Sequence, residues 1–388
     1  MISFLKRIAF LSSTILLIYA CNDVKNNVTF DASFKGGRLD SVLFLKNNSY
    51  RLLINPAFEP VNKSPYFAFS VTSSTPETIN VVLDYGKYKH RYIPKLSTDK
   101  KNWRSIETKN ISMDTMSGNA NLKLHISSQK LFVAAQEIEA SDDTYLWVDK
   151  MIAKHPKIKK TVTGKTVLKK GNYCLVFESD TIQHTIVLVA RQHPPEIPGG
   201  TFSFKAFFEE LFADTDIAKE FRNSFNIYTF PLLNPDGADL GNWRHNANGV
   251  DLNRDWMDFT QPETQMVKNV VEEKVSTGKK IQFAIDFHTS YNGPYLLILD
   301  SINEIKTKKI IPDWINNIES KSKFKVEARR RSQELPYCYN YFINAFGCEA
   351  VTYEEGDEVD RQLIKERAKA YALNLMKTML TKLKNNEL

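Results

Sequence analysis

Cysteine is scarce in this chain, with four residues among 388. Cys21 follows an N-terminal apolar segment, so Cys174, Cys338 and Cys348 remain for the folded body. An odd number of cysteines does not make a disulfide framework. We expect either a bridge between Cys338 and Cys348 or two buried free thiols at these positions.

Other features are missing as well. The chain has no internal repeat, no low-complexity tract and no phosphate-binding glycine motif, so nothing indicates a repeat array or a nucleotide site. The net charge of +7 is moderate for this length. Its densest part, residues 154–170, is better explained as a solvated basic face than as a surface for an anionic polymer. No nucleic-acid-binding module accompanies these charges, and we expect no nucleic-acid partner.

The N-terminal apolar run is too short for a confident membrane span. Residues 1–20 combine a basic start with a short apolar stretch, which is typical of an export signal. The ending Ile18-Tyr-Ala-Cys21 resembles a bacterial lipobox, which implies cleavage before Cys21 and lipid attachment to its sulfur. We therefore expect a membrane-anchored lipoprotein, in the periplasm or at the surface of a Gram-negative bacterium, with residues 21–27 as a linker. An ordinary secretion signal and an uncleaved anchor are the alternatives.

Length and composition predict two globular domains. At 388 residues the chain exceeds one ordinary hydrophobic core, and 42% hydrophobic residues suffice for two. Residues 28–127 contain short β-rich runs between turn residues, which predicts a small antiparallel β-sandwich. In residues 128–388 helical segments alternate with strands, which predicts an α/β domain. The expected helices include residues 145–153, 204–211, 263–273 and 363–383.

Three segments that are far apart in the chain carry side chains suited to a catalytic zinc. His193 and Glu196 follow the apolar run of residues 185–190, and His288 ends a second such run, so two strands deliver these side chains at their carboxyl ends. Two histidines and one glutamate are a ligand set of catalytic zinc, which keeps one position for water. Glu354 adds a carboxylate that can take a proton from that water. The sequence therefore predicts a hydrolase.

The chain between these ligands carries further motifs. They are Asn234-Pro-Asp-Gly237, Gly241-Asn-Trp-Arg244 and Gly249-Val-Asp-Leu-Asn-Arg254. Together with Arg191-Gln-His-Pro-Pro-Glu196, they resemble the motifs of the zinc metallocarboxypeptidases (funnelins), most closely the cytosolic carboxypeptidase branch and its bacterial relatives. The resemblance covers about residues 135–388 and implies a mixed-sheet α/β/α catalytic domain. That branch also carries a β-sandwich ahead of its catalytic domain.

The resemblance implies a metal site built from four matching residues. His193, Glu196 and His288 would bind one zinc ion per chain. Asp251 would accept a hydrogen bond from His193. This agrees with the general behaviour of ligating histidines, which usually give their second ring N–H to a carboxylate.

The resemblance also implies which residues handle the substrate. Glu354 would act as general base and acid, and Arg244 would stabilise the oxyanion. Asn253 and Arg254 would hold the terminal carboxylate, for which a guanidinium offers a matching donor fork. Strand alternation separates Glu354 from Glu355, because Thr352 and Glu354 share one face of the run 350–355. The family pattern Thr-x-Glu selects Glu354.

Two positions depart from the family pattern or leave a choice. Digestive members have an arginine immediately before the glutamate ligand, where this chain has Pro195; the cytosolic branch lacks that arginine too. A tyrosine usually caps the substrate, and Tyr337, Tyr339 and Tyr341 are candidates here. We select Tyr339 and expect at least two of the three to pack within the protein.

The resemblance implies a zinc carboxypeptidase that removes the C-terminal residue of a peptide, and we expect a monomer. One alternative is an amidase acting on cell-wall stem peptides. Another is a surface lipoprotein that only binds peptide or glycan, although binding alone would not need the unbound Glu354. For the terminal side chain, one of Arg329, Arg330 and Arg331 would favour Glu or Asp if it pointed into the pocket. Otherwise all three face solvent, and tyrosines line the pocket.

Overall fold

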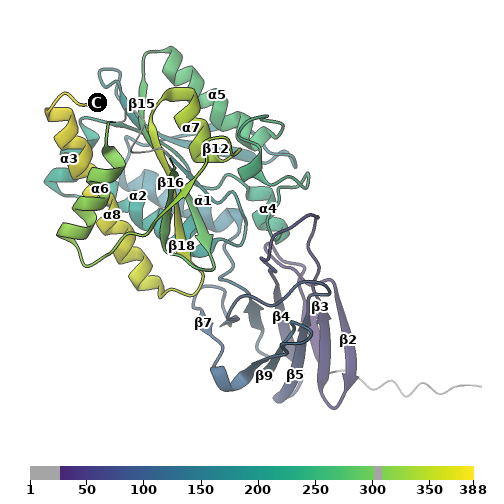
Figure 1. Ribbon diagram of the computed structural model, residues 1–388. Helices are drawn as coiled ribbons and strands as arrows, with labels where there is room; N and C mark the ends of the chain where they lie inside the picture. Colours follow the sequence, from purple (N-terminus) through teal and green to yellow (C-terminus); the bar gives the residue numbers. More distant parts are fainter. Residues whose placement is uncertain (1–26, 301–307) are drawn as a thin grey trace, which may run out of the picture.

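The computed structural model describes residues 27–300 and 308–388, which form a small β part and a larger α/β part in contact with each other (Figure 1). The predicted signal peptide and Cys21 lie outside these residues. None of the helices in the described ranges has the length and apolarity to cross a bilayer.

The N-terminal part contains two five-stranded sheets. One has the order β1 (Val28–Asp31), β4 (Ala68–Ser73), β10 (Leu131–Ala134), β6 (Lys95–Ser97), β7 (Arg104–Ser105). The other has the order β2 (Ser41–Lys46), β3 (Ser49–Leu53), β5 (Glu77–Asp84), β9 (Ala120–Ile126), β8 (Ile111–Met113), with a short 3₁₀ turn, η1 (Thr108–Asn110), before β8. All pairs are antiparallel except β3 with β5.

Alternating side chains explain how these sheets pack. Along β9 every second residue is buried, from Ala120 to Ile126, because successive side chains of a strand point to opposite faces. Strand β10 lies after residue 127, where we expected the catalytic domain to begin, and it still pairs with β4. The N-terminal sheets therefore extend to Ala134.

The catalytic part is built on one mixed sheet of eight strands. Its order is β11 (Lys159–Lys165), β12 (Gly171–Phe177), β14 (Asn226–Phe230), β13 (His184–Ala190), β15 (Lys280–Ser290), β18 (Glu349–Gly356), β16 (Tyr295–Leu299), β17 (Ala328–Arg331). The central strands β14, β13, β15 and β18 run parallel to one another. They are buried almost throughout, which fits the continuous apolar runs seen in the sequence.

Helices cover both faces of this sheet (Figure 1). The helices are α1 (Ser141–Lys154), α2 (Phe204–Leu211), α3 (Asp216–Arg222), α4 (Pro235–Leu240), α5 (Pro262–Ser276), α6 (Ile310–Lys321), α7 (Cys338–Phe346) and α8 (Arg361–Lys384). A π-helical turn, η2 (Pro198–Ser203), leads into α2, and a 3₁₀ turn, η3 (Leu252–Arg254), lies before α5. One core packs under α1, α2, α6 and α8, and another under α5 and α7. The predicted α/β/α fold is confirmed.

The two parts share side chains at their boundary. Trp243, which directly precedes Arg244, is buried in the core of the β-sandwich and meets the ring of Tyr88 edge to face. Arg91 of the sandwich donates to both carboxylate oxygens of Asp357, at 2.7 and 3.0 Å. Arg244 is thus anchored through its neighbour by the other domain.

Candidate metal centre and substrate cavity

The three central strands bring the predicted metal ligands together. His193 and Glu196 lie in the segment that follows β13, and His288 lies near the end of β15. Glu354 of β18 is paired in register with His288. Because these strands are parallel, their carboxyl ends meet at one edge of the sheet, where ligands bind in open α/β folds.

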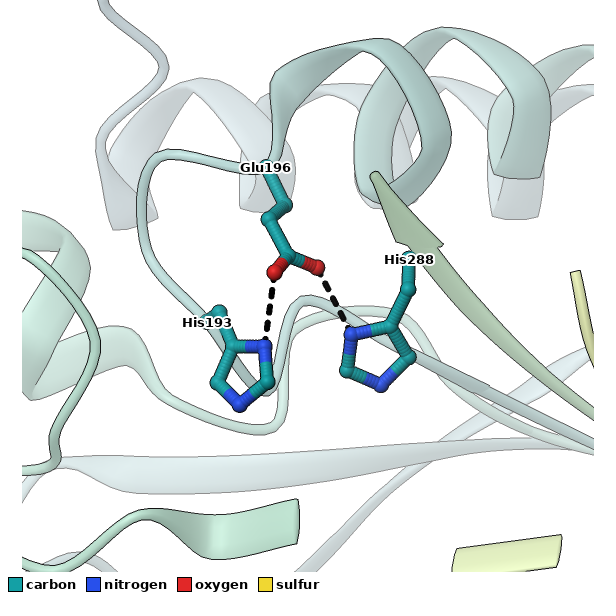
Figure 2. A group of neighbouring side chains, drawn as sticks. All are labelled: His193, Glu196 and His288. Carbon is teal, nitrogen blue, oxygen red and sulfur yellow. Dashed lines mark hydrogen bonds and ion pairs between the residues drawn. The ribbon is translucent and has the colours of Figure 1, made fainter. Parts of the chain in front are cut away.

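The ligand atoms of His193, Glu196 and His288 lie within 4.8 Å of one another (Figure 2). Nδ1 of His193 is 2.7 Å from one oxygen of Glu196, and Nδ1 of His288 is 2.6 Å from the other oxygen. Both rings therefore turn the same nitrogen toward one carboxylate. Two nitrogens and a carboxylate arranged around one point fit a catalytic zinc ion.

The outer nitrogens of both rings are held by carboxylates. Nε2 of His193 lies 2.8 Å from Oδ1 of Asp251, and Nε2 of His288 lies 2.8 Å from Oδ2 of Asp286. A proton held on Nε2 leaves the Nδ1 lone pair free for a metal. Burial alone would raise the pKa of Asp251, but the neighbouring His193 and Arg244 hold that pKa well below its usual range.

Asp286 is a site residue that our sequence analysis did not assign. It also accepts a hydrogen bond from Gln192, whose side-chain oxygen accepts one from the indole of Trp256. A signal for it was present in the sequence. Residues two apart on a strand point to the same face, so a carboxylate at 286 had to lie beside His288.

Glu354 and Glu355 have opposite surroundings. Glu354 lines the cavity, and its Oε2 is buried without a hydrogen-bond partner among the described residues. Burial raises the pKa of Glu354 to about 8. Glu355 is buried on the other face, where it accepts hydrogen bonds from Arg367 and the hydroxyl of Tyr353.

Three residues predicted to contact substrate line the same cavity: Arg244, Asn253 and Arg254. Arg244 donates from Nε to Asp251 at 2.6 Å, which orients its guanidinium. The side-chain oxygen of Asn253 accepts from the backbone N–H of Cys338 at 2.9 Å. Arg254 stays 44% exposed, so most of its donors are available to a ligand.

The structure corrects the choice of tyrosine. Tyr337 lines the cavity and carries the guanidinium of Arg254 at 4.5 Å from its ring centre. Tyr339 and Tyr341 are buried, because residues 338–346 form helix α7 and these rings pack against the core on that side of the sheet. The expectation that two of the three pack internally agrees with this placement, but Tyr339, which we selected, does not line the cavity.

The three arginines before this helix also differ in place. Arg331 lines the cavity. Arg329 is paired with Glu327 and stacked on Tyr295, and Arg330 donates to the backbone oxygen of Asp300.

Cys338 and Cys348 are buried free thiols, so no bridge joins them.

The cavity holds about 1100 Å³ and is bounded by both parts of the chain. Its catalytic side carries the metal cluster, Glu354 and the arginines. Its other side is formed by sandwich segments, among them residues 62–64, 89–93 and 111–113. No local signal in the sequence marks these segments as part of a site, because only the docking of the two parts places them there.

Known proteins resemble this chain in sequence and in fold. Residues 144–385 match the zinc carboxypeptidase family. Cytosolic carboxypeptidase 6 of Caenorhabditis elegans is 25% identical over 306 residues, covering 72% of this chain and 66% of the relative. Its namesake from Mus musculus is 24% identical over 330 residues, covering 76% of this chain and 60% of the relative. The chain thus spans about two thirds or less of the length of these two curated relatives.

Solved structures share the fold across both parts of the chain. A metallo-carboxypeptidase from Burkholderia cenocepacia has a TM-score of 0.75 at 19% identity and covers 93% of this chain and 100% of its own. A metallo-carboxypeptidase from Pseudomonas aeruginosa, in complex with (2-guanidinoethylmercapto)succinic acid, has a TM-score of 0.74 at 18% identity. The match covers 92% of this chain and 99% of that protein.

Proposed function

Because this chain belongs to the zinc carboxypeptidase family, we propose that it hydrolyses the C-terminal bond of peptides that end in a free carboxylate. One observation carries the proposal: a cluster of two histidines and one glutamate shares a cavity with Glu354, whose Oε2 is buried without a hydrogen-bond partner among the described residues. A site that only bound peptide would not need that fourth group.

The reaction assigns a separate task to each charged group. His193, Glu196 and His288 would hold zinc, which when bound supplies a Lewis acid for the scissile carbonyl and for water. Glu354 takes the proton from the water that attacks the carbonyl carbon. It then gives this proton to the amine nitrogen as the C–N bond breaks. A carboxyl with a raised pKa suits this double role, because it holds the proton between the two transfers.

Arginines serve the two oxygen groups of the substrate. Arg244, fixed by Asp251, donates to the oxygen that becomes negative during attack. Arg254 receives the terminal carboxylate, and the ring of Tyr337 holds its guanidinium in place. Asn253 precedes Arg254 in the chain, and its side-chain oxygen accepts a hydrogen bond from the backbone N–H of Cys338 at the start of α7. The terminal carboxylate thereby sets which peptide bond faces Glu354.

We also propose that Arg331 contacts the terminal side chain and favours Glu or Asp, since it alone of residues 329–331 lines the cavity. Profiling release from peptides that differ only in the last residue tests this. Equal rates for terminal Glu, Leu and Lys would remove the acidic preference. Arg331→Ala should lower the rate for terminal Glu and spare that for terminal Leu.

For the cellular location, we propose an exported, membrane-anchored lipoprotein, on the basis of residues 1–21. Mass spectrometry of the mature N-terminus tests it. A Cys21 that carries lipid on its sulfur is expected, and Cys21→Ser should release the protein from membranes. An intact residue 1 would point to an uncleaved anchor.

The activity is tested by metal analysis combined with peptide hydrolysis. We expect about one zinc per chain, with release of the terminal residue lost in chelator and restored by zinc. Full activity of the metal-free protein would contradict the proposal. Hydrolysis restricted to cell-wall stem peptides would favour the amidase, and tight peptide binding without any turnover would favour a binding lipoprotein.

A further inference from the structure

Arg244 lies between two buried ring side chains that both contact the β-sandwich. Trp243 is 1% exposed and meets the ring of Tyr88 edge to face, at 5.3 Å between ring centres. His245 is 5% exposed and meets the ring of Phe58 edge to face, at 6.1 Å. Both distances are in the range of favourable ring pairs. The arginine assigned to the oxyanion is thus flanked by two contacts with the other part of the chain.

The loop that carries Phe58 connects β3 with β4 and packs on the catalytic part. A Cβ placed on Gly249 would lie 2.7 Å from Cδ1 of Phe58, so the ring occupies the space that a larger residue at 249 would need. Gly249 also has a φ of +78°, which favours glycine. The motif that supplies Asp251 and Arg254 therefore leaves room for a ring from the sandwich.

Hydrogen bonds join this loop to the second sandwich segment that contacts the catalytic part. Glu59 accepts from the hydroxyl of Tyr88 at 2.9 Å and from Nζ of Lys87 at 2.7 Å. Phe58 directly precedes Glu59 in the chain. The rings of Phe58 and Tyr88, which contact the two neighbours of Arg244, therefore belong to one connected support.

On the catalytic side, the support of Arg244 is shared with a metal ligand. The guanidinium donates from Nε to one oxygen of Asp251 at 2.6 Å, and the other oxygen of Asp251 lies 2.8 Å from Nε2 of His193. A change at Asp251 would therefore disturb the arginine and the ligand together. A change at Phe58 acts from across the domain boundary and reaches the arginine through His245.

We propose that Phe58 is a positioning residue for Arg244. Its ring contacts His245, and this contact keeps the chain at residue 244 where the guanidinium meets the oxygen of the scissile carbonyl. The inference rests on the proposed function, which assigns Arg244 to that oxygen. A donor lowers the barrier only when it is already aimed at the developing charge, so a loosened arginine lowers kcat while substrate binding is kept.

The first experiment compares substitutions of phenylalanine in the zinc-loaded protein. Phe58→Ala should lower kcat about tenfold, with KM and zinc content near the native values. Phe58→Tyr retains the ring and should keep kcat within about twofold of native. Phe44→Ala removes a half-exposed ring from β2, outside the cavity lining, and should leave kcat at the native value. This control separates the contact with His245 from a general effect of the sandwich.

A double-mutant cycle with Arg244→Ala tests whether the effect passes through the arginine. Arg244→Ala alone should lower kcat by about 10²–10³-fold. Adding Phe58→Ala should cause no further loss, because the guanidinium that the ring positions is already absent. A native kcat in Phe58→Ala, or the same fold loss in both backgrounds, would overturn the inference.

Hydrogen exchange followed by mass spectrometry separates a failure of this inference from a failure of the proposed function. In Phe58→Ala, the amides of residues 242–246 should exchange about tenfold faster than in the native protein, whereas those of α5 should keep the native rate. If the native protein hydrolyses no peptide, the proposed function fails, and the exchange alone decides whether Phe58 holds this segment. Equal exchange at residues 242–246 in both proteins would overturn that role.

Discussion

At the scale of single residues, Glu354 and Glu355 are neighbours in β18 but face opposite sides of the sheet and have different roles. Glu354 lines the cavity, and its Oε2 has no hydrogen-bond partner within residues 27–300 and 308–388, whereas Glu355 faces the core and neutralises Arg367. The same substitution at the two positions should therefore damage different properties of the protein. Because both positions hold glutamate, the same Glu→Gln change tests a catalytic role at 354 and a folding role at 355.

Glu354→Gln should keep zinc but lower kcat by about 10²–10⁴-fold, because the amide cannot carry the proton from water to the amine. Zinc content and steady-state hydrolysis of one peptide give both quantities. If the variant instead loses zinc while His288→Ala retains it, the assignment of ligands is wrong.

Glu355→Gln is the matched control. It leaves the buried guanidinium of Arg367 without its counter-charge, which typically costs about 3–5 kcal/mol of folding stability. Urea unfolding should show this loss, while the folded fraction retains turnover near the native value. A large drop in kcat with unchanged stability would reverse the roles of the two glutamates.

Arg254→Ala should strongly reduce kcat/KM for peptides with a free terminal carboxylate, because the charged fork that holds this group is gone. Peptides with an amidated terminus should be poor substrates for both native and variant protein. Comparing the two peptide types measures how much selectivity Arg254 provides. Efficient cleavage of amidated peptides by the native protein would instead indicate an endopeptidase or another amidase.

At the scale of secondary structure, β15 carries on one face the predicted metal ligand His288 and the carboxylate of Asp286 that contacts its ring. Asp286 and His288 lie two residues apart, so the strand itself sets the 2.8 Å contact between them. The neighbouring strand β18 then brings Glu354 into register with His288. The sheet therefore sets the positions of His288, Asp286 and Glu354, whereas His193 and Glu196 lie in the segment that follows β13.

Asp286→Asn should weaken zinc binding by about 10–100-fold, because the amide no longer fixes the Nε2 proton of His288. Competition with a chromogenic chelator measures the affinity. Asp258→Asn, an exposed aspartate before α5, is the control and should bind zinc like the native protein. Equal affinity in both variants would show that Asp286 does not support the metal.

At the scale of the whole molecule, the sandwich completes the cavity and is tied to the catalytic part. Arg91 and Asp357 are 14% and 3% exposed and come from different domains. The burial of Trp243 in the sandwich core adds an apolar contact next to Arg244. The contacts that join the two parts therefore lie next to the cavity that both parts line.

The Arg91–Asp357 pair should show strong coupling in a double-mutant cycle. Each single change to Ala leaves one partly buried charge unpaired and should cost about 3 kcal/mol of unfolding free energy, whereas the double variant should lose clearly less than the sum. Urea unfolding followed by tryptophan fluorescence measures all four proteins. Additive losses would mean that the two side chains do not depend on each other.

The sequence by itself determined the family, the α/β/α fold and the residues of the metal cluster, because these rest on local patterns. Apolar runs mark buried strands, alternation separates Glu354 from Glu355, and motif spacing carries the resemblance. The match to the zinc carboxypeptidase family confirms the family, and the shared fold of the solved structures agrees with the predicted architecture.

Only the tertiary structure decided what depends on contacts between distant segments. It placed Tyr337 in the cavity and buried Tyr339, because the packing of α7 sets which ring faces outward. It also brought Lys63 and Lys89 to the catalytic cavity, more than a hundred residues from the metal cluster in the chain. Docking of two domains follows from complementary surfaces, and no local sequence pattern encodes which loops will meet across them.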